Sequence, residues 1–163
     1  MKHFEAVYTG EEGTIGSYSL QYTPKSFADD FELDLKSRHF NGKRIFAMLV
    51  WAGPDDMEPD EVRKNSYHRD NYMQCAGSNA AMTVEVRVTH PDRSFEHYVV
   101  AREPVRDPNA WTTITWDNGS PELCVWRLHQ EEVFTGEQAA KVFRDYIEHD
   151  QLPPKELLRR TEN

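Results

Sequence analysis

A run of strictly alternating apolar residues near the middle of the chain constrains its fold most strongly. Every second position from Met82 to Val88 is apolar, which is typical of a strand with one buried face. Residues 90–93 follow with a proline and an aspartate, as in a turn, and a second strand is indicated over 95–102. The pattern predicts a β-hairpin, and a hairpin requires an antiparallel sheet.

Further short strands are predicted on both sides of this hairpin, because short β-rich segments recur between turn residues. The predicted segments are Phe4–Tyr8, Ser17–Tyr22, Lys43–Trp51, Trp111–Trp116 and Leu123–Val133. No segment repeats and none is low in complexity, so we expect residues 1–163 to form a single domain.

Residues 26–38 admit two interpretations. Ser26 with Asp29 is a candidate helix N-cap, whereas apolar residues alternate from Phe31 to Leu35. We interpret the segment as a strand, because Asn41-Gly42 then follows as a type I′ turn that leads into the next strand.

The C-terminal part of the chain predicts a helix. Thr135 is a suitable N-cap and Gln138 completes a capping box. Apolar residues then recur at helical spacing over 139–147, and Pro153-Pro154 prevents the helix from continuing. The predicted fold class is therefore α+β, with an antiparallel sheet of about six strands and the C-terminal helix packed on it.

The balance of charge excludes several kinds of partner. The chain carries 28 acidic and 19 basic residues, a formal net charge of −9. Nucleic acids and anionic membrane surfaces both require clustered Lys and Arg, so neither is expected to bind. The N-terminus has no apolar secretory segment and the chain has only two cysteines. These features indicate a cytoplasmic protein with reduced thiols.

No catalytic or metal-binding motif stands out, so we predict a protein that is not an enzyme and needs no cofactor or metal. The alternative is a small-molecule-binding or hydrolytic domain whose site lies in a long acidic and polar loop over 53–79, which includes a helical turn near Glu61–Lys64. The residues of that alternative site are Tyr67, His68, Asp70 and Cys75.

Acidic residues gather at the start of this loop. The nine positions from Gly53 to Glu61 contain no basic residue and five acidic ones, namely Asp55, Asp56, Glu58, Asp60 and Glu61. Such a cluster either keeps a solvated loop soluble or forms an edge, stiffened by its prolines, that binds a basic partner. Trp51 and Trp111 are candidate anchors for that partner, since Trp is enriched among the residues that dominate binding energy.

The C-terminal segment also resembles a known group of proteins. Residues 132–146 (EVFTGEQAAKVFRDY), with Gln151-Leu152-Pro153 and Leu157-Leu158 after them, resemble the helix and tail of small bacterial immunity proteins from polymorphic toxin systems. The resemblance is to the superfamily often paired with nucleic-acid deaminase toxins, and it covers about thirty residues, with Phe143 and Tyr146 as the aromatic pair. It implies an acidic, cytosolic α+β protein that binds a cognate toxin domain and occludes its active site.

Overall fold

The computed structural model describes residues 1–17 and 22–161, in which seven strands form one antiparallel sheet. In spatial order the strands are β2 (Gly13–Ser17), β1 (Phe4–Gly10), β3 (Ile45–Ala52), β4 (Tyr72–Gly77), β5 (Met82–Thr89), β6 (Phe95–Val100) and β9 (Leu158–Thr161). A separate two-stranded sheet joins β7 (Thr112–Trp116) to β8 (Cys124–Leu128). The predicted α+β class is confirmed, with one more strand in the main sheet and a second small sheet.

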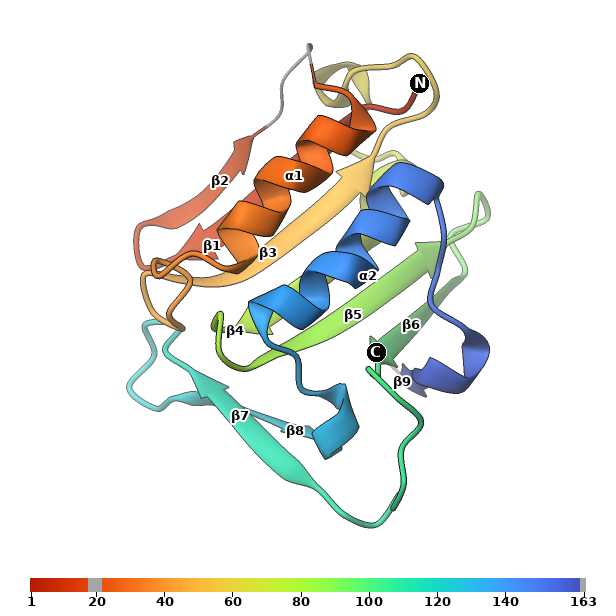
Figure 1. Cartoon of the computed structure of the whole chain (residues 1–163). Helices are drawn as coiled ribbons and strands as arrows, with labels where there is room; N and C mark the ends of the chain where they lie inside the picture. Colours follow the sequence, from red (N-terminus) through yellow and green to blue (C-terminus); the bar gives the residue numbers. More distant parts are fainter. Residues whose placement is uncertain (18–21, 162–163) are drawn as a thin grey trace.

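Two α-helices of the described chain, α1 (Pro24–Leu35) and α2 (Gly136–His149), lie side by side on one face of the main sheet (Figure 1). Their contact includes Phe31 and Phe143, whose ring centroids are 4.9 Å apart. The core fills the space between this helix layer and the sheet. Its buried members include Met48, Val50, Met73, Val84, Val86 and Ile147.

The hairpin and the C-terminal helix agree with the sequence prediction. β5 and β6 pair in antiparallel register around Val86 and Tyr98. Thr135 is the N-cap of α2 and forms the capping box with Gln138. The helix ends at His149, before the two prolines. Both elements are encoded by local signals, namely strict alternation, a turn and a cap.

The interpretation of residues 26–38 as a strand is wrong, because α1 occupies most of them. The capping box is formed by Thr23 and Ser26, so the N-cap lies earlier than expected. Phe27, Phe31 and Leu35 recur four residues apart and are buried. Leu33 produced the apparent alternation, but it is 68% exposed on the outer face of the helix.

The prediction that Asn41-Gly42 forms a hairpin turn between two strands is also wrong. These residues connect α1 to β3, where the Asn41 side chain accepts hydrogen bonds from the backbone N–H groups of Lys43 and Arg44. The N-terminal hairpin instead joins β1 to β2 at Gly10 and Gly13. Most of the predicted strand Ser17–Tyr22 lies outside the described residues.

The long loop predicted over 53–79 ends earlier than expected, because β4 occupies residues 72–77 in the middle of the sheet. What precedes β4 contains two short 3₁₀ turns, η1 (Pro59–Glu61) and η2 (Tyr67–Asp70). Two further 3₁₀ turns, η3 (Gln130–Glu132) and η4 (Lys155–Leu157), flank α2 and its tail. None of the described helices is long and apolar enough to cross a membrane.

Candidate functional site

The predicted acidic cluster, residues 53–61, forms a loop at one end of the sheet, directly after β3 and beside the N-terminus (Figure 1). We call residues 53–61 the acidic loop. Four of its five carboxylates are exposed, those of Asp55, Asp56, Asp60 and Glu61, whereas Glu58 is half-buried. These four carboxylates are therefore accessible to solvent, as both the solvated loop and the partner-binding edge require.

Two of these carboxylates pair with groups at the N-terminus. The Met1 ammonium lies 2.9 Å from an oxygen of Asp56, and its hydrogen bond and charge hold the pKa of that carboxyl below the ordinary value. Glu58 lies 3.2 Å from Nδ1 of His3. Asp55 and Asp60, by contrast, make no ion pair within residues 1–17 and 22–161. Glu61 likewise makes no ion pair among the described residues and instead accepts the backbone N–H of Glu58 at 2.9 Å, so three negative charges of the loop remain without a cation.

A guanidinium beneath the loop fixes its shape. Arg69 donates hydrogen bonds to the carbonyl oxygens of Pro59 and Val62 at 3.1 and 2.7 Å. The same guanidinium lies over the ring of Trp51, 4.6 Å from its centroid. Because Arg69 is bound to backbone carbonyls, it orders the loop without forming an ion pair with its carboxylates.

Trp51 is consequently not the exposed anchor that the sequence suggested. It is only 2% exposed, and its indole N–H donates to Glu5 at 3.2 Å. Trp51 lies on the face of β3 away from the helices, where it supports Arg69. Its structural role is to connect the acidic loop to the sheet.

A pocket of about 520 Å³ opens next to the acidic loop, between the sheet and the C-terminal end of α2. Phe4 and Val86 give it an apolar floor, and Tyr146 and Leu152 line it from α2 and the following tail. Asp55 also lines this pocket, together with Lys2, Arg87 and Asp150, so an unpaired carboxylate of the acidic loop lies at the edge of a depression with an apolar floor and a charged rim.

The alternative site predicted from Tyr67, His68, Asp70 and Cys75 is not assembled in the structure. Cys75 is fully buried under the helices, and burial raises the pKa of its thiol. Tyr67 stacks on His68 with ring centroids 4.2 Å apart, but of the four residues His68 alone lines the pocket beside the acidic loop. Asp70 is exposed near Arg93. These four side chains do not converge on one cavity.

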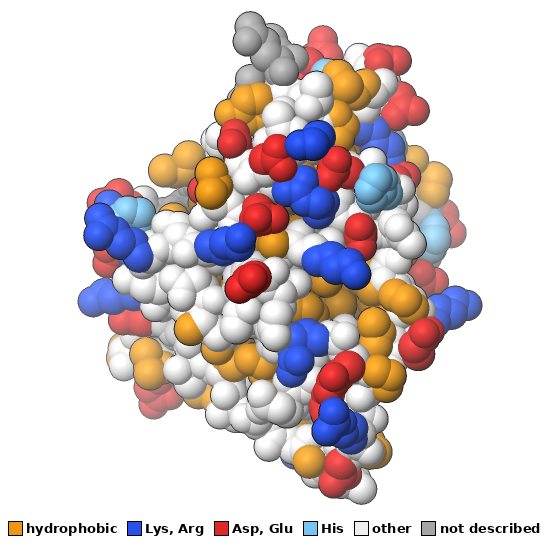
Figure 2. Space-filling view, in the orientation of Figure 1, with side chains coloured by type: hydrophobic (Ala, Val, Ile, Leu, Met, Phe, Trp, Pro, Cys, Tyr) orange, Lys and Arg blue, Asp and Glu red, His pale blue; other side chains and the backbone are white. Residues whose placement is uncertain are grey.

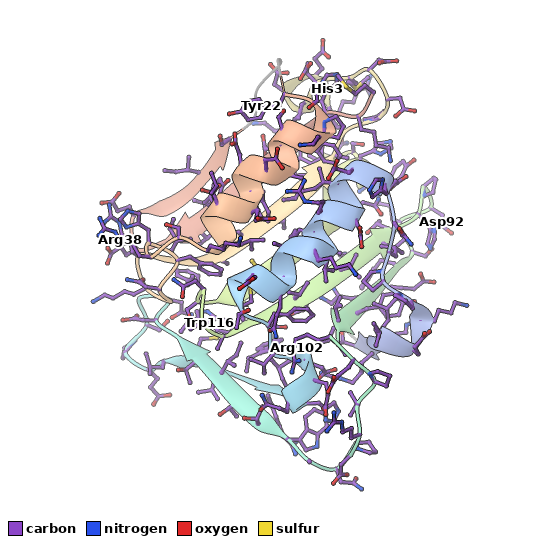
Figure 3. All side chains as sticks on the ribbon, viewed as in Figure 1. His3, Tyr22, Arg38, Asp92, Arg102 and Trp116 are labelled. Atoms are coloured by element: carbon purple, nitrogen blue, oxygen red, sulfur yellow. The ribbon has the colours of Figure 1, made fainter. Side chains whose placement is uncertain are left out.

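Trp111 lies just before β7, in the part of the molecule opposite the acidic loop (Figure 1). It is 38% exposed, stacks on His129 at 3.8 Å between ring centroids, and lies under the guanidinium of Arg127. Figure 3 shows the separation, since the labelled His3 of the acidic end and Trp116 of β7 are far apart in the view. A single interface of ordinary size on one face cannot be centred on both regions.

The polar groups around Trp111 form hydrogen bonds with one another. Glu132 is buried and receives two hydrogen bonds from the guanidinium of Arg159, at 2.8 and 3.0 Å. Its carboxylate also accepts the backbone N–H of His129 at 2.8 Å. Buried Glu132 and His129 thus form a network with the half-buried Arg159, and Trp111 packs on His129 and Arg159. A structural role explains this aromatic residue without any partner.

Three residues of the candidate site were missed by sequence reasoning. Arg69 holds the acidic loop, whereas Tyr146 and Leu152 line the pocket beside that loop. The capping box and apolar spacing of α2 placed Tyr146 on a helix, but nothing local indicates that it borders a pocket.

Neither a metal centre nor a known relative defines the site. Across the described ranges, no group of three or more His, Cys, Asp or Glu side chains is arranged to hold a metal ion. No protein-family model, curated protein or solved structure matches the chain. Its function must therefore be argued from the acidic end itself.

Proposed function

We propose that the chain is a non-enzymatic immunity protein that binds a basic toxin domain in the cytoplasm and occludes its active site. One observation carries the proposal. The acidic loop presents the unpaired carboxylates of Asp55 and Asp60 on a backbone that Arg69 and Trp51 hold in place. The toxin class that the tail resemblance implies is a nucleic-acid deaminase.

A fixed set of unpaired carboxylates suits this task for two reasons. Complementary charge steers a basic partner and raises the rate of encounter. A loop that is already ordered also loses little conformational entropy on binding. An enzyme that acts on nucleic acid has cations that bind phosphates, and carboxylates can occupy the same positions. Substrate mimicry of this kind would block the active site without any chemistry by the inhibitor.

The proposal is tested by expressing the protein together with the product of the adjacent gene, which in polymorphic toxin systems encodes the toxin. We expect the neighbour to be toxic alone, to be neutralised by this protein and to purify with it as a complex. The double variant Asp55→Asn/Asp60→Asn should weaken the complex about tenfold, since charge pairs at interfaces contribute one or more kcal/mol.

The matched control is Glu11→Gln/Glu12→Gln, which removes two exposed charges from the turn between β1 and β2. Because both variants carry the same net charge, only the position of the lost charges differs. A neighbour that is neither toxic nor bound refutes the proposed function. Equal weakening by the two variants would show that net charge, not the acidic loop, attracts the partner.

A further inference from the structure

The helix layer does not cover the whole sheet. Seven strands about 4.8 Å apart span about 29 Å between the outer strands, whereas packed helices are about 10 Å apart. Two helices therefore leave a part of this face open. In Figure 1, α1 lies over β1 and β3 and α2 lies over β4 and β5. The strands of the sheet beyond α2 are β6 and β9, and the tail after α2 runs beside them.

A groove of about 680 Å³ lies between α2 and the tail, at the C-terminal end of β6. Val100 and Phe134 contribute to its apolar lining, Val142 lines it from α2, and Leu152 and Leu157 line it from the tail. Figure 2 shows hydrophobic side chains at the surface in this region, with charged side chains around them. The groove has the volume of a binding site, and half of its lining residues are apolar.

The charged residues on the rim indicate what the groove would bind. Glu137, Lys141 and Asp145 follow one another at four-residue spacing along α2, and none makes an ion pair within the described chain. Arg102, labelled in Figure 3, donates from two of its nitrogens to the carbonyl oxygens of Val133 and Gln130. Along α2 the rim thus carries two carboxylates on either side of one ammonium group. Across the groove, Arg102 is a second cation without an ion pair among the described residues, and Glu103 pairs with Arg106.

Leu152 connects this groove to the acidic end. The residue is 41% exposed and lines both the groove and the pocket that contains Asp55. The pocket beside the acidic loop and the groove are thus adjacent at Leu152, with the Lys2–Asp150 ion pair on the pocket side. This continuity is the second reason to assign the groove to the same partner.

We propose that the groove binds an amphipathic α-helix of the basic partner, in the position that a third helix of the layer would occupy. This inference rests on the proposed function. The apolar face of the helix lies on Val142 and Leu152. Basic residues about two turns apart pair with Glu137 and Asp145, which are separated by about 12 Å at 1.5 Å per residue. An acidic or polar residue between them meets Lys141.

The test uses the complex with the product of the adjacent gene. Leu152→Glu and Val142→Glu each place a carboxylate on the apolar part of the groove. We expect each to raise Kd at least about tenfold, because a buried apolar contact is replaced by an unpaired charge. Leu123→Glu is the control, since Leu123 is 56% exposed in the connection between β7 and β8, away from the groove. This control should bind like the wild type.

Hydrogen exchange of the complex supplies a second measurement. Protection on binding should extend over residues 137–145 and 151–157 as well as the acidic loop. Because Leu152 is 41% exposed and lies in the tail after α2, Leu152→Glu should fold normally, and circular dichroism checks this. The Leu152→Glu variant therefore tests the groove even if Val142→Glu is unstable.

The outcomes separate the two proposals. If Asp55→Asn/Asp60→Asn weakens the complex but both groove variants bind normally, the groove proposal is overturned and the proposed function stands. If the neighbour does not bind at all, both proposals are overturned, because the groove loses its proposed occupant. A dimer of the free protein that Leu152→Glu dissociates would assign the groove to a second copy and would also overturn it.

Discussion

The acidic loop and the surroundings of Trp111 both look like binding surfaces in the sequence, but they differ in how their polar groups are satisfied. At the Trp111 end, Glu132 accepts from Arg159 and from the backbone of His129, and Trp111 stacks on the same histidine. At the acidic end, Arg69 binds backbone carbonyls and leaves nearby carboxylates unpaired. The residue types in both regions suggest a binding surface. The two regions differ in whether their charged groups already have partners within the chain.

The largest expected effect on the free energy of unfolding is at Glu132. Glu132→Gln removes the buried charge that Arg159 and His129 share, so the free energy of unfolding should fall by about 3 kcal/mol. Asp60→Asn, which removes an exposed and unpaired charge, should change it by less than about 0.5 kcal/mol. Urea unfolding of the two variants measures the difference. Equal effects would remove the distinction between the two regions.

The second effect concerns the support of the acidic loop. Arg69→Ala should lower the free energy of unfolding by about 2 kcal/mol, because hydrogen bonds from a charged group to carbonyls and a cation–π contact are lost. Limited proteolysis should show faster cleavage within residues 53–71. Arg69→Lys keeps the charge but not the forked donor geometry, so it should not restore the loop. Full rescue by lysine would mean that the charge alone matters.

The smallest effect is electrostatic and concerns the N-terminus. The Met1 ammonium lowers the pKa of Asp56, so the stabilisation from this pair is present at neutral pH. It is lost as the pH falls below the ordinary value of 3.8 and through the lowered pKa. N-terminal acetylation should return the pKa of Asp56 toward 3.8, as followed by NMR titration of its carboxyl carbon. An unchanged pKa would contradict the ion pair.

The sequence was sufficient where one segment determines its own structure. The β5–β6 hairpin and α2 follow from alternation and from a capping box. Prediction from the sequence failed where the exposure of a side chain depends on segments far away in the chain. Leu33 imitates a strand period because nothing local shows that it faces solvent. Cys75 was placed in a loop because β4 is a short strand in the middle of the sheet, bounded by turn residues.

The candidate site was predictable to a similar extent. Clustering along the chain was enough to find the acidic loop. Trp51 was misassigned because a strand residue can be buried on the face of the sheet away from the helices, here beneath Arg69. Leu152 could not be found at all, since its role depends on a pocket and a groove that meet only after α2 packs on the sheet.

The most direct test of the account is the rate at which the protein associates with the product of the adjacent gene, measured by stopped flow at low and high salt. We predict that Asp55→Asn/Asp60→Asn lowers the association rate several-fold at low salt and flattens its salt dependence. Glu11→Gln/Glu12→Gln and Trp111→Ala should leave the association rate and its salt dependence close to those of the wild type. If Trp111→Ala slows association while the acidic-loop variant does not, the two regions have been assigned the wrong way round.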